Sequence, residues 1–326
     1  MNARKRHAIS PGRRGLRRQH RGFSLVELLI AVVLGLFVVA VVVQGFAATT
    51  SSSNTNSAVA ESRTNGRHAL EVLKREVRHA ALAGMVWEST QIVNEDANLV
   101  NKNYGCGAGF VNQLGVGISG GNDSNPFYGI CLQSESITPS TAATTASYAR
   151  GDVLVLRRTA MQAATSFDAG APYVRIAYGV ANLSNGSSTP PLLAAPNFDY
   201  RVVSDIFYVN AFTSSGTEAP RVPALYRLTL SAGANPVMTP QLVASNVEHF
   251  QVQFAEDDGL GNVRYRNANA VTDWSLVRSA RFWLLLRESL PDPGFASGSY
   301  VMGDVTYTPA DNYRRAVYTT TVALRN

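Results

Sequence analysis

The chain has 326 residues and a mass of 35.0 kDa, enough for one large domain or two smaller ones. Hydrophobic residues make up 45% of it and charged residues 16%, a composition that excludes a chain disordered throughout its length. Two cysteines are too few for a disulfide-rich scaffold or for a zinc site built from four cysteines.

The formal net charge of +6 comes from the N-terminus. Residues 1–22 contain eight of the 29 lysines and arginines and no Asp or Glu. In the rest of the chain the acidic residues slightly outnumber the basic ones. We therefore predict no direct binding of nucleic acid by the main part of the protein.

A long apolar run follows the basic stretch. Residues 28–43 contain no charged side chain, and apolar neighbours extend the segment to about 25 residues, enough to cross a bilayer as a helix. The preceding cations place residues 1–22 in the cytoplasm and the residues after Gln44 on the other side. A cleavable signal peptide, cut near Ala47 and Ala48, is an alternative interpretation.

Glu27 distinguishes these interpretations. A carboxylate at the start of the apolar run is unusual in a signal peptide, and within a bilayer it costs about 3 kcal/mol or more unless it is paired. Hydration of Glu27 at the level of the lipid headgroups is the simpler alternative. The neighbouring residues favour a more specific role, because they form the string Gly22-Phe23-Ser24-Leu25-Val26-Glu27.

This string resembles the class III signal of type IV prepilins and pseudopilins. The resemblance implies that a prepilin peptidase removes residues 1–22 as a leader, by cleavage between Gly22 and Phe23, and that Phe23 is then N-methylated. It also implies that Glu27 pairs with the N-terminal amine of a neighbouring subunit during filament assembly. Two opposite charges buried in an apolar helical bundle must pair in this way.

Helical spacing returns after a polar segment. Residues 49–57 form helices poorly, but apolar residues then recur every three to four positions up to residue 81. Glu71 and Arg75 are spaced as an i,i+4 pair, and Gly84 is a helix-stop residue. Because pilins have one long N-terminal helix, the resemblance implies one helix over residues 23–85, and the polar residues at 49–57 leave open a loosening there. We interpret its basic cluster around Lys74 as a solvated face.

Strand patterns dominate the remaining chain. Short apolar or alternating runs occur at residues 153–157, 173–178, 202–209, 224–230, 247–254, 280–286 and 317–324. Turn residues separate several of them, as at 182–191 and 256–262. We predict an α+β fold, in which the long N-terminal membrane-spanning helix packs on a mostly antiparallel, β-rich globular head at residues 86–326.

The two cysteines lie in a segment rich in Gly and Asn, on the predicted extracytoplasmic side. We expect a structural disulfide between Cys106 and Cys131, because that compartment is oxidising and the histidines His79 and His249 are not spaced as further metal ligands.

Weaker motifs suggest other chemistry. Residues 115–120 fit G-x-G-x-x-G, and Ser119 fits G-x-S-x-G, but no helix can begin in the following Gly/Asn/Pro stretch, so we predict a flexible loop. Calcium binding by the acidic turn at 256–262 is the alternative to a solvated turn. After the leader the chain has three histidines, His68, His79 and His249. We therefore expect no enzyme, no resident metal and no cofactor.

The C-terminal part adds a second resemblance. Residues 247–254, the segment 274–287 and the closing segment 314–326, which ends in Arg-Asn, resemble PilW-type minor pilins. The implied function is a minor pilin in type IV pilus assembly or initiation, in a priming or tip complex. The implied partners are the prepilin peptidase, other minor and major pilins and the inner-membrane assembly platform.

The implied location is the inner membrane of a diderm bacterium, as a single-pass protein with a periplasmic head, and then the pilus and cell surface. Two alternatives remain: a minor pseudopilin of a type II secretion system, and a surface adhesin or membrane-anchored hydrolase that uses the pilin-like helix only as an anchor.

Overall fold

The computed structural model describes residues 22–81, 85–86, 91–93, 96–134, 147–188 and 190–325, with the side chains of Ser51 and Ala97 left out. The predicted leader before Gly22, the predicted stop at Gly84 and the final Asn326 lie outside these residues. The chain divides into two units, Met1–Asn54 and Thr55–Asn326, which we describe separately.

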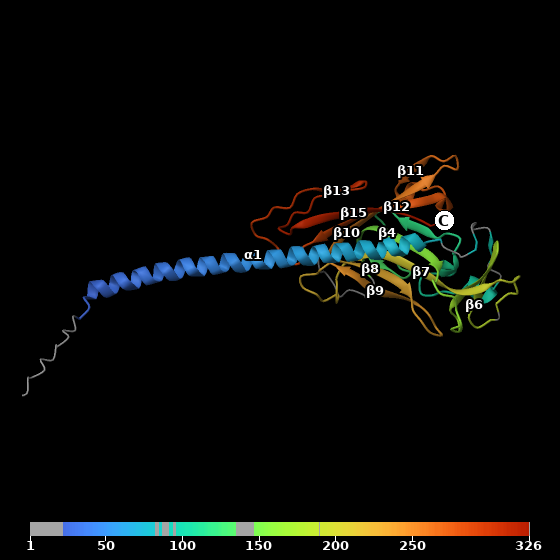
Figure 1. Ribbon diagram of the computed structural model, residues 1–326, viewed down its shortest axis with the longest axis horizontal. Helices are drawn as coiled ribbons and strands as arrows, with labels where there is room; N and C mark the ends of the chain where they lie inside the picture. Colours follow the sequence, from blue (N-terminus) through green and yellow to red (C-terminus); the bar gives the residue numbers. More distant parts are fainter. Residues whose placement is uncertain are drawn as a thin grey trace, which may run out of the picture. The chain divides into compact units, whose positions relative to one another are not determined.

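One long helix, α1, spans Leu25–His79 (Figure 1). Its first part carries the apolar run, whose side chains are exposed in the structure. The loosening left open at residues 49–57 does not occur, because helix continues through them. The hydroxyl groups of Thr49 and Thr50 donate to the carbonyls of Gly45 and Phe46 at 2.8 and 2.9 Å, so these polar side chains bond within the helix.

The helix ends before the predicted glycine. The chain turns at Ala81, which has a φ of 61° and donates its N–H to the carbonyl of Arg157 at 2.9 Å. A β-strand of the head thus binds the first residues after α1.

The larger sheet has nine strands among the described residues. They are β1 (Ile92–Val93), β2 (Ile118–Gly121), β3 (Gln133–Ser134), β4 (Ser147–Thr159), β5 (Pro172–Ala177), β6 (Val180–Asn185), β7 (Phe198–Asn210), β8 (Ala224–Leu230) and β9 (Met238–Ser245). The order is β1-β6-β5-β7-β4-β2, β3 also pairs with β4, and β8 pairs with β7 and β9. All pairs are antiparallel except β1–β6 and β3–β4.

The smaller sheet has the antiparallel order β11-β10-β12-β15. Its strands are β10 (Val247–Asp257), β11 (Val263–Arg266), β12 (Val277–Arg287) and β15 (Arg315–Ala323), and a separate hairpin contains β13 (Tyr300–Met302) and β14 (Val305–Tyr307). The short helices are α2 (Ala97–Val100) and 3-10 turns at Phe110–Asn112, Ala268–Ala270 and Trp274–Leu276.

Two hydrophobic cores lie on opposite faces of the larger sheet. Along β4, Leu154 and Leu156 enter the core that also contains α1 and the smaller sheet, whereas Val153 and Val155 enter the second core. This alternation is the two-residue period of a strand buried on both faces. The first core receives from α1 the side chains of Ala69, Leu70, Leu73, Val77 and Ala80.

The predicted α+β class is confirmed. Each of the seven predicted runs falls on a strand, and the turn at 256–262 joins β10 to β11. The sequence did not predict the strands β1, β3, β6, β9, β11, β13 and β14. The G-x-G-x-x-G segment was predicted as a flexible loop, but part of it is β2, in which Ser119 pairs with Val155 of β4.

Candidate functional site: the N-terminal helix and its attachment to the head

The N-terminal motif lies at the start of α1. Helix begins at Leu25, and the N–H of Leu28 donates to the carbonyl of Ser24 at 3.1 Å. Phe23 is 81% exposed, and Glu27 lies in the first turn, where the helix dipole favours a negative charge. Gly22 has no atom within 4 Å of where a side chain would start. Gly22 and Phe23 are both exposed in the structure.

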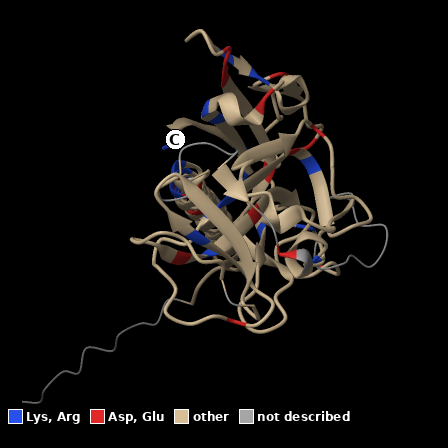
Figure 2. Cartoon of the chain, turned by 90° about the vertical axis from the view of Figure 1, so that its right-hand side faces the viewer, with Lys and Arg blue, Asp and Glu red and all other residues tan. Residues whose placement is uncertain are grey.

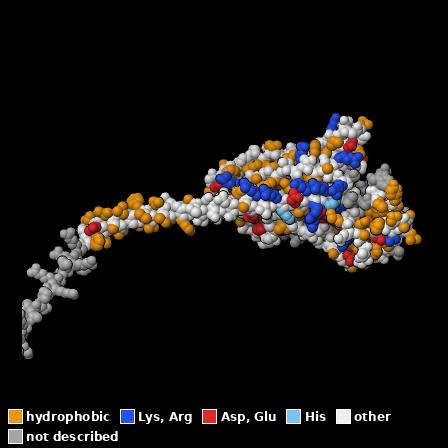
Figure 3. All heavy atoms as spheres, in the orientation of Figure 1, with side chains coloured by type: hydrophobic (Ala, Val, Ile, Leu, Met, Phe, Trp, Pro, Cys, Tyr) orange, Lys and Arg blue, Asp and Glu red, His pale blue; other side chains and the backbone are white. Residues whose placement is uncertain are grey.

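The helix has the length and composition of a membrane span. Among the described residues, α1 alone contains an apolar window long enough to cross a bilayer. Large apolar side chains from Leu25 to Phe46 are exposed, as Figure 3 shows by their orange colour along the helix. Exposed apolar surface of this extent is suited to lipid or to the helices of other subunits.

The second half of α1 carries a buried carboxylate that the sequence analysis did not identify. Glu76 has a side chain only 3% exposed and accepts hydrogen bonds from Arg158 of β4 at 2.7 and 3.0 Å. Arg75 also donates to it, at 2.9 Å. Burial alone would raise the pKa of Glu76, but the guanidinium of Arg158 overcomes this effect and holds the pKa below its usual range.

The ion pairs on the helix differ from those predicted. Glu71 accepts from Lys74 at 3.0 Å, and Arg75 donates to Glu76 rather than forming the expected pair with Glu71. Glu76 follows Leu73 by three positions and precedes Val77, so helical spacing places it on the buried face. That spacing is the sequence signal that could have identified it.

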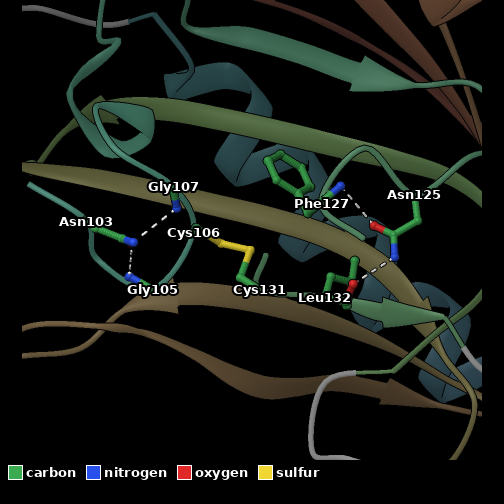
Figure 4. Close-up of a disulfide and its surroundings, with 8 residues drawn as sticks. All are labelled: Asn103, Gly105, Cys106, Gly107, Asn125, Phe127, Cys131 and Leu132. Carbon is green, nitrogen blue, oxygen red and sulfur yellow. Dashed lines mark hydrogen bonds between the residues drawn. A yellow bond between two sulfur atoms is a disulfide. The ribbon is translucent and has the colours of Figure 1, made fainter. Parts of the chain in front are cut away.

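The predicted disulfide is confirmed. Cys106 and Cys131 are bonded, and the two loops that hold them are braced by asparagine side chains (Figure 4). Asn103 accepts from the N–H groups of Gly105 and Gly107, while Asn125 accepts from the N–H of Phe127 and donates to the carbonyl of Leu132. The bonded segment forms part of the second core.

We expect replacement of both cysteines by serine to destabilise the head. A loop closed across a sequence separation of 25 contributes about 3.5 kcal/mol on the chain-entropy estimate. Urea unfolding of the full chain in detergent, with and without reductant, measures the effect. Equal midpoints for the oxidised parent and the double variant would contradict the expected stabilisation.

The acidic turn forms a capped hairpin. The side chain of Asp258 accepts from the N–H groups of Leu260 and Asn262, and that of Asp257 from the N–H of Gly259. Glu256 is bonded to Thr272 and lies 2.8 Å from Arg266. The carboxylates of the acidic turn thus bind backbone and side-chain groups of the protein itself. The described residues contain no group of three or more His, Cys, Asp or Glu placed to hold a metal.

The remaining chemical candidates are dispersed. His68 is exposed on α1, His79 is half-buried near its end, and His249 is buried on β10. Ser119 lies on a strand, where the backbone of Gly120 packs so closely that a Cβ would lie 2.6 Å from the carbonyl oxygen of Val153. The described residues following β2 form turns and a strand, so the helix that either glycine motif requires is not there.

Two buried titratable groups lie where β4 meets β10. Burial raises the pKa of Asp152 to about 7, even though its carboxylate accepts from the N–H groups of Asp123 and Val252. Burial, aided by Arg150, lowers the pKa of His249 to about 4. Both groups therefore favour their neutral forms in the folded state.

These two groups should affect stability in opposite directions. The contribution of Asp152 to the free energy of unfolding falls as pH rises from about 4 to about 7, because its carboxyl ionises in the unfolded state before it ionises in the folded state. The contribution of His249 to the free energy of unfolding falls as pH drops from about 6.5 to about 4, because its imidazole is protonated in the unfolded state before it is protonated in the folded state. In the parent, we expect the two contributions to offset each other largely. In His249→Gln only the Asp152 contribution remains, so we expect the stability of this variant to fall as pH rises from about 4 to about 7.

Urea midpoints at intervals between pH 4.5 and 7 test this expectation, and Asp152→Asn should show the opposite slope. Parallel curves for the parent and both variants would show that neither group has a shifted pKa.

The chain matches two known protein families in different segments. Residues 17–43 match the family model of the prokaryotic N-terminal methylation motif, and residues 206–326 match the model described as type IV pilus-assembly protein W, or PilW. The chain is thus similar to type IV pilus proteins of the PilW type in its C-terminal part and to N-methylated pilus proteins at its N-terminus. The second match begins within β7 and covers the whole smaller sheet, and the first includes Gly22, Phe23 and Glu27.

Other comparisons add little. No curated protein matches the chain. Among solved structures, the type IV-like pilin TTHA1219 from Thermus thermophilus is similar over 80% of this chain and 95% of that chain, with 13% sequence identity and a TM-score of 0.34.

Proposed function

We propose that this protein is a minor pilin of the PilW type that takes part in assembly or initiation of a type IV pilus, within a priming or tip complex. The observation that carries the proposal is the joint occurrence of the methylation motif at 17–43 and the PilW segment at 206–326 in one chain. In this role the protein acts mechanically. Its apolar helix enters the filament core, and its head meets the heads of neighbouring subunits.

The proposal includes processing at the N-terminus. The prepilin peptidase cleaves between Gly22 and Phe23 and methylates the new amine of Phe23. Glu27 then pairs with the amine of an adjacent subunit. The exposure of Gly22 and Phe23 and the position of Glu27 in the first helical turn support these roles.

The location follows from the same features. The basic residues before Gly22 stay in the cytoplasm, α1 crosses the inner membrane once, and the head lies in the periplasm before the protein enters the pilus. The disulfide between Cys106 and Cys131 is suited to that oxidising compartment. The partners of the protein are other minor and major pilins and the assembly platform.

The size of the head supports a low-abundance position. The second unit extends from Thr55 to Asn326, and a repeated head of this size would crowd a helical lattice. Immunogold labelling of sheared pili tests this point. Label at one end of each filament is expected, and label along the whole length would contradict a tip position.

Deletion of the gene in the source bacterium tests the function itself. We expect loss of surface pili and of twitching with normal enzyme secretion, both restored by the parent gene. Loss of enzyme secretion with normal piliation would instead assign the protein to a type II secretion system as a minor pseudopilin.

A further inference from the structure

The outer edge of strand β15 offers unpaired backbone groups. Among the described residues, β15 pairs with β12 alone. At the two ends of this ladder, Glu288 donates to the carbonyl of Arg314 and Leu324 to that of Arg278, both at 2.9 Å. In an antiparallel ladder the bonded positions alternate, so even-numbered residues of β15 face β12. The N–H and C=O groups of Val317, Thr319, Thr321 and Ala323 therefore point away from the sheet.

This edge lacks the features that usually protect an edge strand. The ladder from Arg315 to Ala323 has no bulge, and the strand contains neither Pro nor Lys. The outward residues at 317, 319, 321 and 323 are also exposed as side chains. A long regular edge of this kind can accept another strand.

Helix α1 runs beside the same strand. The backbone of Gly66 packs against Tyr318 of β15 so closely that a Cβ would lie 3.0 Å from the ring, and Val77 and Val322 share one core. The opposite flank of α1 faces β9, because Asn65 donates to Ser245 at 3.0 Å. With 100° per residue, Gly66 lies within the core face, so the helix presents in succession a flank toward β9, the core face that also contacts β15, and an exposed side.

A row of cations follows next around the helix. Arg63, Arg67, Lys74 and Arg78 lie within about 60° of one another, on the side of α1 that follows the core face in the direction away from β9. Lys74 is paired with Glu71, whereas the structure gives no ion pair for the three arginines with any described residue. Figure 3 shows Lys and Arg in a line along this part of the head, and Figure 2 shows them on the helix viewed from its end.

We propose that the edge of β15 and this cation row together bind an extended acidic segment of a second protein. The segment adds as a further strand through the outward backbone groups of β15. Because side chains alternate across a strand, every second residue faces the side on which α1 lies, and acidic residues there meet Arg63, Arg67 and Arg78. The backbone contacts supply affinity, and the charges select an acidic partner.

A synthetic peptide is the probe. A fluorescent decapeptide of alternating Thr and Glu places all its carboxylates on one face, and the same peptide with Lys in place of Glu is the charge control. Fluorescence anisotropy with the full chain in detergent micelles measures binding at low salt. We expect the Glu peptide to bind and the Lys peptide not to bind. Failure of the Glu peptide to bind, or equal binding of both, would overturn the proposal.

Two variants test the two halves of the site. Thr319→Pro removes an outward N–H and leaves the bonds to β12 in place, and Arg67→Glu reverses one charge. We expect each to weaken binding about tenfold, the equivalent of one lost hydrogen bond or ion pair of about 1.4 kcal/mol. Arg264→Glu, exposed on β11 at the other edge of the same sheet, is the matched control and should bind like the parent.

Amide hydrogen exchange in the parent gives an independent readout. Saturating peptide should slow exchange at Val317, Thr319, Thr321 and Ala323 and leave the even-numbered amides, already bonded to β12, unchanged. Unchanged exchange at the four outward amides would overturn strand addition even if the peptide binds. Concentration-dependent protection without peptide would show that a second copy occupies the edge, and would overturn an acidic partner.

Discussion

Replacing Glu27 with Ala is expected to leave the protein cleaved and in the membrane but absent from pili. On the proposed function, the carboxylate pairs with the N-terminal amine of a neighbour inside an apolar bundle, and the truncation leaves that amine buried and unpaired. Breaking one partner of a buried ion pair costs about 3–5 kcal/mol, which corresponds to a loss of incorporation of more than ~100-fold.

Immunoblots of sheared pili and of membranes measure this ratio. Glu27→Asp keeps the charge and should retain part of the incorporation, while Glu71→Ala, at a side chain 72% exposed further along α1, should behave like the parent. Normal incorporation of Glu27→Ala into pili would show that Glu27 has no role in assembly.

Replacing Arg315 with Met is expected to lower the free energy of unfolding by about 3–5 kcal/mol. The Arg315 side chain is fully buried, bonds Glu248 and Asp311, and donates to Ser297 at 2.9 Å. The Glu248 side chain is only 3% exposed, so the substitution leaves a buried carboxylate without its cation. The hydrogen bond from Arg315 also lowers the pKa of Asp311 to about 2, so Asp311 loses its stabilising charge only in strong acid.

The adjacent residue gives a matched control. Arg314 is 44% exposed and pairs with Asp292 near the surface, so Arg314→Met should cost less than about 1 kcal/mol. Urea unfolding of the two variants in the same detergent compares them directly. Equal losses would show that burial of the Arg315 pair adds nothing to the stability of the smaller sheet.

Much of the fold was predictable because local patterns agree with it. The apolar run and the later helical spacing predicted α1, and the alternating runs predicted the strands with the strongest β-formers. The interruption at residues 49–57 was overestimated, since Thr49 and Thr50 satisfy their hydroxyl groups within the helix.

The missed strands have weak local signals. β9 contains Pro240, which an edge strand can accommodate because β9 pairs only with β8. β6 is rich in Asn and Ser and forms through its pairing with β5 and, in parallel, with β1. In β2, Gly120 permits close contact with β4, so the glycines that suggested a loop serve tertiary packing instead.

The sequence predicts site residues only at the N-terminal end of the candidate site, and their roles remain predictions. Gly22, Phe23 and Glu27 are identified by their order along the chain, which needs no tertiary information. Glu76 and Arg158, in contrast, meet only because α1 packs across β4, and the outward groups of β15 are defined only by its register with β12.

The central claim is that this chain is processed as a prepilin. The most direct test is the N-terminal sequence and mass of the protein recovered from membranes, with the prepilin peptidase present and absent. We expect a start at N-methylated Phe23 that depends on the peptidase. A start after Ala48, as in a secreted protein, or an intact Met1, as in a plain membrane anchor, would contradict the filament mechanism.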